Sequence, residues 1–173
     1  ITDDYAEALN AHISGDFEQA IFRAQSVLGW KRSAAAHRII GLAQEGAGNA
    51  EAAVAAHKSA RKINKNQPEA QAGDEINLAS AYVAFGDNES ALAAYERAFA
   101  LKPDWLTAPL GIISVLNRQG RQTDLHQFLT ELLAADTGVA SNVVFLDHLE
   151  NDTDFIGVKN IVERIKKNKE LQS

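Results

Sequence analysis

The acidic stretch at residues 152–157, Asp-Thr-Asp-Phe-Ile-Gly, is the part of the sequence most similar to a metal site. With Glu163 it partly matches the calcium loop D-x-D-x-D-G-x5-E, in which oxygen ligands surround a hard cation. However, Ile156 stands where an oxygen ligand is required, and Lys159 stands where an apolar residue is usual. We therefore expect a polar residue of this stretch to cap a helix, and we predict no metal site.

The other side chains that could do chemistry are scattered along the chain. The histidines are His12, His37, His57, His126 and His148. They do not form the helical histidine pair with a glutamate that zinc hydrolases use. Residues 46–51 partly match a nucleotide-binding glycine loop, but Glu51 replaces its third glycine and no strand precedes it. There is no cysteine, no serine nucleophile elbow and no lysine-serine phosphate loop, so the sequence predicts no enzymatic activity and no cofactor.

Composition narrows the classes of partner. The 173 residues suffice for one domain or a short repeat array, and 46% apolar with 23% charged residues is ordinary for a folded protein. A net charge of -6 provides no electrostatic source of nucleic-acid affinity, and we interpret the basic residues between Lys159 and Lys169 as a solvated helix face. No apolar run reaches membrane-spanning length, so we expect no membrane insertion. The lack of cysteine leaves the compartment open, and because the chain starts at Ile1 and has no methionine, we expect a trimmed or processed chain.

A short motif recurs along the chain and indicates what positions these residues. Residues 15–21, 48–54 and 86–92 share the pattern Gly, Asp or Asn, any residue, Glu, any residue, Ala, aliphatic. With Gly120 as a fourth member, the glycines recur at intervals of 33, 38 and 34 residues, the period of a helix-turn-helix repeat. We expect each glycine to end one helix in a left-handed cap. The residue that caps or begins the next helix is then Asp16, Asn49, Asp87 or Thr123.

Residues 73–105 form the clearest unit. Its key residues are Leu78, Ala79, Tyr82, Gly86, Ala91, Tyr95, Ala98 and Pro103. They follow the spacing L-G-x2-Y, A-x3-F, P, so this unit resembles the tetratricopeptide repeat (TPR) family, with Ala79 in place of Gly and Glu75 in place of the usual Trp. Small residues in this pattern let helices approach, and larger ones fill the gaps, so we interpret the aromatic residues as core. Because proline favours the first helical turn, we expect the first helix of this unit to begin near Pro68.

The other units are weaker but keep the same register. We predict an all-α solenoid of about four TPR helix-turn-helix repeats, at about 1–33, 34–71, 72–105 and 106–138. In the second repeat, Gln44 and His57 stand at aromatic positions, which predicts a thinner interface within that pair. The fourth repeat carries larger residues such as Ile112 and Leu129 in place of small ones.

From about residue 139 the register breaks. Val143 to Leu149 suggest a short buried helix, and an apolar stripe at helical spacing follows: Phe155, Val158, Ile161, Val162 and Ile165. Because the end of a repeat stack would otherwise expose apolar surface, we interpret 139–173 as a C-terminal cap. The alternative is that this stripe docks onto a partner or a second copy, forming a homodimer through the C-terminal helix.

The resemblance implies a binding surface. TPR superhelices commonly hold a peptide or partner helix in a concave groove lined by the first helix of each pair. The matching positions are Tyr5, Leu9, His12, Arg38, Leu42, Glu45, Ile76, Ser80, Val83, Leu110, Ser114, Asn117 and Arg118. Leu9, Leu42 and Ile76 could instead belong to the core between helices. The lysines and asparagines with which some members clamp the carboxylate of chaperone tails are not matched here, which disfavours that partner class.

The repeat and the lack of a catalytic grouping together predict a protein-protein interaction scaffold whose groove accepts an amphipathic helix or an extended segment with aliphatic anchors. Replacing Tyr5, Arg38 or Arg118 is then expected to weaken partner binding while changing stability by less than about 0.5 kcal/mol. The alternative hypothesis is a non-catalytic accessory domain of a longer enzyme, such as a glycosyl- or sulfotransferase, or of an export assembly.

Overall fold

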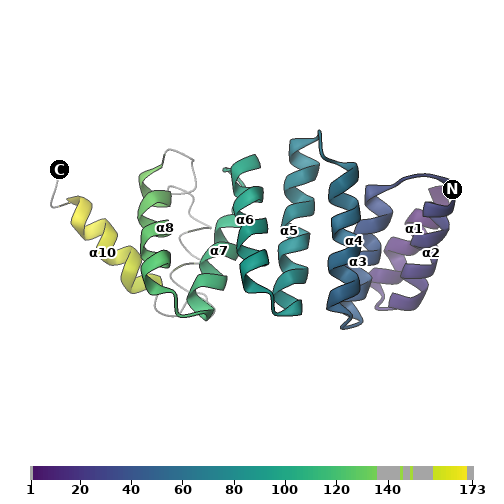
Figure 1. The fold of residues 1–173 in the computed structure, drawn as a ribbon, viewed down its shortest axis with the longest axis horizontal. Coiled ribbons are helices and arrows are strands. Elements are labelled where there is room, and N and C mark those ends of the chain that lie inside the picture. Colours follow the sequence, from purple (N-terminus) through teal and green to yellow (C-terminus); the bar gives the residue numbers. More distant parts are fainter. Residues whose placement is uncertain (1, 136–144, 146–148, 150–157, 171–173) are drawn as a thin grey trace. The chain divides into compact units, whose positions relative to one another are not determined.

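The chain folds into helices joined by short turns in a computed structural model, which describes residues 2–135, 145, 149 and 158–170 (Figure 1). It divides into two compact units, residues 1–102 and 103–173. The helices of the first unit are α1 (Thr2–Ile13), α2 (Phe17–Trp30), α3 (Ala34–Gly46), α4 (Ala50–Ile63), α5 (Pro68–Phe85) and α6 (Asn88–Leu101). Those of the second unit are α7 (Thr107–Arg118), α8 (Gln122–Ala134) and α10 (Val158–Glu170). The all-α prediction is confirmed.

The four predicted glycines end the first helix of each pair. Their φ angles are 81°, 78°, 89° and 67° at Gly15, Gly48, Gly86 and Gly120. Each following residue donates its backbone amide to a carbonyl five residues earlier, as in Asp16 to Ala11 at 2.9 Å and Asp87 to Tyr82 at 2.9 Å. This pairing satisfies carbonyls that a helix end leaves without partners. The recurring motif therefore works as predicted, as a local stop signal.

The start of the second helix differs from turn to turn. Asp16 and Asp87 cap α2 and α6, because their carboxylates accept from the backbone amides of Gln19 and Ser90. Asn49 occupies the same position before α4 but makes no side-chain cap bond. In the fourth turn Arg121 is the N-cap, so Thr123 lies inside the first turn of α8.

Small residues bring the helices of the first unit together. Alanines from every helix of this unit are buried: Ala8, Ala20, Ala24, Ala36, Ala43, Ala53, Ala60, Ala72, Ala79, Ala91 and Ala98. Of the larger predicted core residues, Leu78 is fully buried, whereas Tyr82 and Tyr95 are half-buried. Helix α5 begins at Pro68 as predicted, ahead of residue 72, where the repeat boundary was expected.

Helix order within the first unit is set by two kinds of contact. Each helix packs against the next one along the chain, from α1 with α2 through α5 with α6. First helices of successive pairs also touch, α1 with α3 and α3 with α5. Helices α1, α3 and α5 therefore form a continuous layer.

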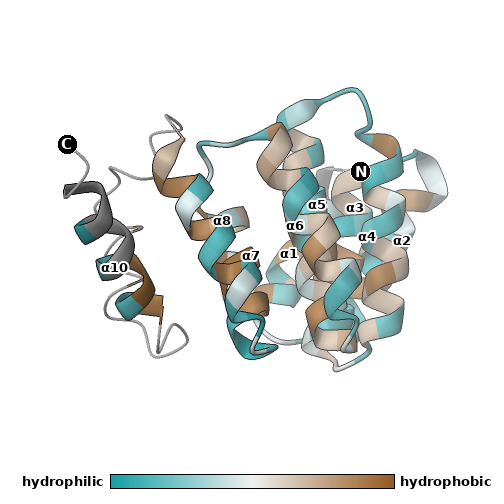
Figure 2. Cartoon of the chain, turned by 60° about the vertical axis from the view of Figure 1, so that its left-hand side comes forward, coloured by the Kyte–Doolittle hydropathy of each residue, from teal (hydrophilic) through white to brown (hydrophobic). Residues whose placement is uncertain are grey.

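The second unit has a bulkier core, as the sequence predicts. Its α7–α8 hairpin buries Ile112, Ile113, Val115, Leu116, Leu125, Leu129 and Leu132. Helix α10 contacts α8 and buries Val158, Ile161 and Val162. Figure 2 shows brown, apolar segments among teal ones in the first turns of α10. Phe145 and Leu149 are also buried.

Some of the predictions concern residues that lie outside the described part of the chain. Val143, Val144, Leu146 and Phe155 lie outside the described residues, as does the acidic stretch 152–157. Lys159 and Lys167 of the basic cluster are exposed. Within the described part of the chain, no helix is both long and apolar enough to cross a bilayer.

Candidate functional site

Helices α1, α3 and α5 each carry three of the predicted groove residues at i, i+4 and i+7, a spacing that places them along one helix face. We call this set the first-helix surface: Tyr5, Leu9, His12, Arg38, Leu42, Glu45, Ile76, Ser80 and Val83. Because α1 touches α3 and α3 touches α5, the three faces belong to neighbouring helices of one unit.

The α1 part of this surface is apolar and accessible. Tyr5 and Leu9 lie one helical turn apart and are 37% and 38% exposed. His12 is instead turned toward its own hairpin, where its ring lies 6.0 Å from that of Phe17. Its buried Nδ1 has no hydrogen-bond partner among the described residues. Of the three predicted groove residues on α1, Tyr5 and Leu9 are therefore better placed than His12 to meet a ligand.

Arg38 is tied to the interior rather than free. Its guanidinium donates to the Asp74 carboxylate at 3.1 Å, and the Asn64 side-chain amide donates to the other carboxylate oxygen at 2.6 Å. Asp74 has no exposed surface, so without these donors its charge would be buried unpaired. This contact argues against the expectation that Arg38 can be replaced at little cost to stability. Beside it, partial burial lowers the pKa of His37 below 6.5.

Glu45 connects three helices. One carboxylate oxygen lies 2.8 Å from Nε2 of His57 on α4, and the other accepts from the Ser80 hydroxyl on α5 at 3.2 Å. The structure thus brings together two predicted surface residues, Glu45 and Ser80. Both charged members of the first-helix surface, Arg38 and Glu45, already have partners inside the protein.

His57 fills the space expected of an aromatic residue. It is fully buried, and a Cβ atom on Gly41 would overlap its imidazole ring. The predicted thinning of the second pair is therefore wrong, because the ring packs directly on the backbone of α3. The histidine keeps this packing while its Nε2 reaches Glu45.

Glu75, at the usual tryptophan position, has a structural role that the sequence did not indicate. It is almost completely buried, and its carboxylate oxygens accept from Arg61 on α4 at 3.3 Å and Arg97 on α6 at 2.9 Å. The charged contact thus links three helices where a large apolar ring would otherwise pack. Its neighbour Asp74 links α5 to α3 and α4 in the same way.

The other predicted groove residues are Leu110, Ser114, Asn117 and Arg118 on α7, in the second unit. The first three are half-buried, and Arg118 is exposed. On α3 and α5, the apolar members Leu42, Ile76 and Val83 are also half-buried, so each contributes both to packing and to the surface. No group of three or more potential metal ligands gathers within the described residues.

Comparison with known proteins identifies the fold through structure rather than sequence. No protein-family model matches the chain, and no curated protein matches it by sequence. A solved structure of MamA has a TM-score of 0.62 at 16% identity, with 95% of each chain covered. A second MamA structure has a TM-score of 0.55 at 19% identity, covering 82% of this chain and 94% of that one.

A structure from Podosopora anserina, described as a putative kinesin light chain with nearly identical TPR-like repeats, is also similar. Its TM-score is 0.66 at 15% identity, covering 99% of this chain and 96% of that one. These likenesses show that the chain has a TPR-like solenoid fold, as the repeat motif predicts.

Proposed function

We propose that this chain of TPR-like fold is a non-catalytic scaffold whose first-helix surface holds a peptide or a helix of a partner protein. The observation that carries the proposal is the exposure of Tyr5 and Leu9, one turn apart on α1. Large apolar side chains that stay accessible on a helix face are the anchors by which grooves hold amphipathic helices or extended segments.

The charges on this surface support the same choice of ligand. Arg38 is compensated by Asp74, and Glu45 is compensated by hydrogen bonds from Ser80 and with His57. A charged ligand group would compete with these internal contacts for Arg38 and Glu45, which reduces the net gain from its own hydrogen bonds. The surface therefore favours a partner segment that presents aliphatic or aromatic side chains to α1.

The internal contacts also give the surface a fixed shape. Asp74 joins α5 to α3 and α4, whereas Glu75 joins α5 to α4 and α6. A surface held in one arrangement loses less conformational entropy when it binds, which favours affinity. We propose that the buried ion pairs serve binding in this indirect way.

We also propose that residues 139–173 cap the array. The stripe residues Val158, Ile161 and Val162 are buried, and α10 packs on α8 within the second unit. Side chains used in this way are not available to a second copy, so the burial favours the cap over a homodimer formed through this helix.

The test is affinity capture with the immobilised chain in an extract of its native source, followed by mass identification and measurement of the Kd of each captured protein. Replacing both anchors, Tyr5→Ser with Leu9→Ser, is expected to weaken binding at least about tenfold, as for central interface residues. The control replaces two exposed aromatic residues on α2, Phe22→Ser with Trp30→Ser, and should leave Kd unchanged. The opposite pattern would place the partner on α2 and overturn the proposal.

A further inference from the structure

A cleft opens at one end of the first unit, and none of its lining residues belongs to the first-helix surface. Its volume is about 590 Å3, and its walls are the turn between α3 and α4, the first turn of α4 and the last turn of α5. The lining residues are Gln44, Gly48, Asn49, Ala50, Glu51, Ala52, Ala84 and Phe85. None of them is basic.

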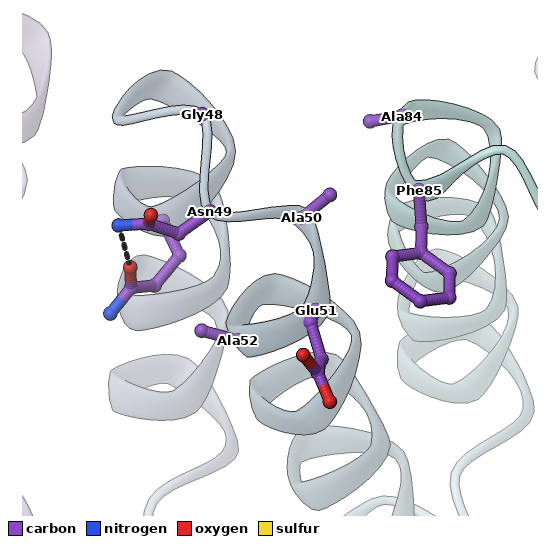
Figure 3. Close-up of a pocket in the computed structure, with 8 residues that line it drawn as sticks. Gly48, Asn49, Ala50, Glu51, Ala52, Ala84 and Phe85 are labelled. Carbon is purple, nitrogen blue, oxygen red and sulfur yellow. Dashed lines mark hydrogen bonds between the residues drawn. The ribbon is translucent and has the colours of Figure 1, made fainter.

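Two side chains give this cleft its chemical character. Figure 3 shows Glu51 on α4 and Phe85 on α5, each drawn along its own helix, and both side chains line the cleft. Phe85 is 54% exposed, so its ring is accessible to a ligand. Neither residue has a hydrogen bond, ion pair or ring contact to another described residue. Each is therefore available to a ligand.

Asn49 lies on the rim of the cleft but is paired within the protein. Asn49 donates its side-chain amide to the side-chain oxygen of Gln44 at 2.9 Å, as drawn in Figure 3. Figure 3 shows the Asn49 side chain turned away from Phe85, so Glu51 supplies the carboxylate on the α4 wall of the cleft.

We propose that this cleft binds an arginine side chain of a partner protein. A guanidinium stacks on a phenyl face through cation–π attraction and donates several hydrogen bonds in its plane. Here the ring would be Phe85, and the acceptor would be the carboxylate of Glu51. A neutral apolar group could pack against the Phe85 ring, but it would give the Glu51 carboxylate no counter-ion.

The unpaired backbone amides at the start of α4 would favour an anionic ligand. The net local charge therefore decides whether the cleft attracts an anion or a cation. A helix N-terminus acts as about half a positive charge. Glu51 lies in this first turn and carries a full negative charge, so the net charge at the cleft is negative. The cleft therefore attracts a cation and repels a carboxylate or phosphate.

The inference goes beyond the proposed function, because it concerns a separate point of contact. A partner held on the first-helix surface could reach this cleft with a second segment, and a different partner could use the cleft alone. Variants of Tyr5 or Leu9 leave the cleft intact, and variants of Glu51 or Phe85 leave the first-helix surface intact, so the two ideas fail separately.

The experiment titrates the intact chain with blocked tripeptides Gly-Arg-Gly, Gly-Lys-Gly and Gly-Glu-Gly while backbone amide shifts are followed by NMR. We expect the arginine peptide to shift the amides of residues 50–52 and 85, the lysine peptide to bind more weakly, and the glutamate peptide to leave them unchanged. Glu51→Gln and Phe85→Leu should each raise the Kd for the arginine peptide about two- to fivefold.

Two matched controls separate the cleft from general charge and apolar effects. Glu18→Gln is the control for Glu51→Gln, because Glu18 has the equivalent position in the first turn of α2. Phe22→Leu is the control for Phe85→Leu, because Phe22 is another exposed phenylalanine. Both should leave the Kd unchanged. Tighter binding of the glutamate or lysine peptide, the same affinity in the Glu51 and Phe85 variants, or no shift at the cleft amides would each overturn the proposal.

Discussion

The imidazole of His57 packs so closely on Gly41 that no side chain fits between α3 and α4 at this point. Glycine inside a helix normally costs stability, and replacing it with alanine normally gains about 0.5–1 kcal/mol. For Gly41→Ala we predict the opposite sign, a loss of about 1–3 kcal/mol, because the new methyl group overpacks the interface. Chemical denaturation of the two proteins measures this difference.

Gly73→Ala is the matched control, since Gly73 lies inside α5 and an added Cβ there would meet nothing within 4 Å. This variant should gain the ordinary increment in stability. Equal effects of the two substitutions would mean that His57 does not occupy the position described.

Arg38 provides a second prediction, because its partner Asp74 is fully buried. Arg38→Ala removes one of the two donors that compensate this carboxylate, so we expect a loss of about 1–3 kcal/mol in the free energy of unfolding. Arg118→Ala removes the same side-chain type from an exposed position on α7 and should change stability by less than about 0.5 kcal/mol. Calorimetric or denaturant unfolding distinguishes them, and a neutral Arg38→Ala would show that Asp74 does not depend on this pair.

Leu78 and Tyr82 should respond differently to truncation although both belong to the repeat motif. Leu78 is completely buried, so Leu78→Ala leaves a cavity and is expected to cost about 2–5 kcal/mol. Tyr82 is half-buried, with the Lys58 ammonium 5.4 Å from its ring centre, and Tyr82→Ala should cost less. Denaturant midpoints in the reverse order would contradict this account of the α5 core.

Asp87 should titrate below its ordinary pKa of 3.8, because hydrogen bonds from Ser90 and the nearby Lys58 charge favour its ionised form. A folded-state pKa below the unfolded value stabilises the protein above the unfolded pKa, and this contribution disappears as pH falls through the folded pKa. Ser90→Ala is expected to raise the pKa of Asp87 by removing the side-chain contribution. NMR titration of the carboxyl carbon measures both values, and no difference between the two proteins would refute the assignment.

Features that depend on neighbouring residues in the sequence were predictable. The left-handed turns at Gly15 and Gly86 follow from a motif of a few residues, as do the carboxylate caps of Asp16 and Asp87. Pro68 likewise marks the start of α5 through its own backbone geometry. These signals give the helix order and the TPR-like fold.

Features that depend on residues far apart in the sequence could not be predicted from it. The buried pairs of Asp74 and Glu75 join residues from four helices, and nothing local in the sequence assigns Arg38 to one carboxylate and Arg97 to the other. His57 was misread for the same reason, since its fit depends on Gly41 in the preceding helix. Helical spacing predicted which residues share the first-helix surface. It could not show that Arg38 and Glu45 are already hydrogen-bonded to other residues of the protein.

The most direct test of the central claim places a photoreactive benzophenone amino acid in the intact chain, once in place of Leu9 on α1 and once in place of Trp30 on α2. After irradiation with a captured partner, we predict a crosslink from position 9 to a contiguous apolar segment of that partner, and none from position 30. A crosslink from position 30 alone would contradict binding at the first-helix surface.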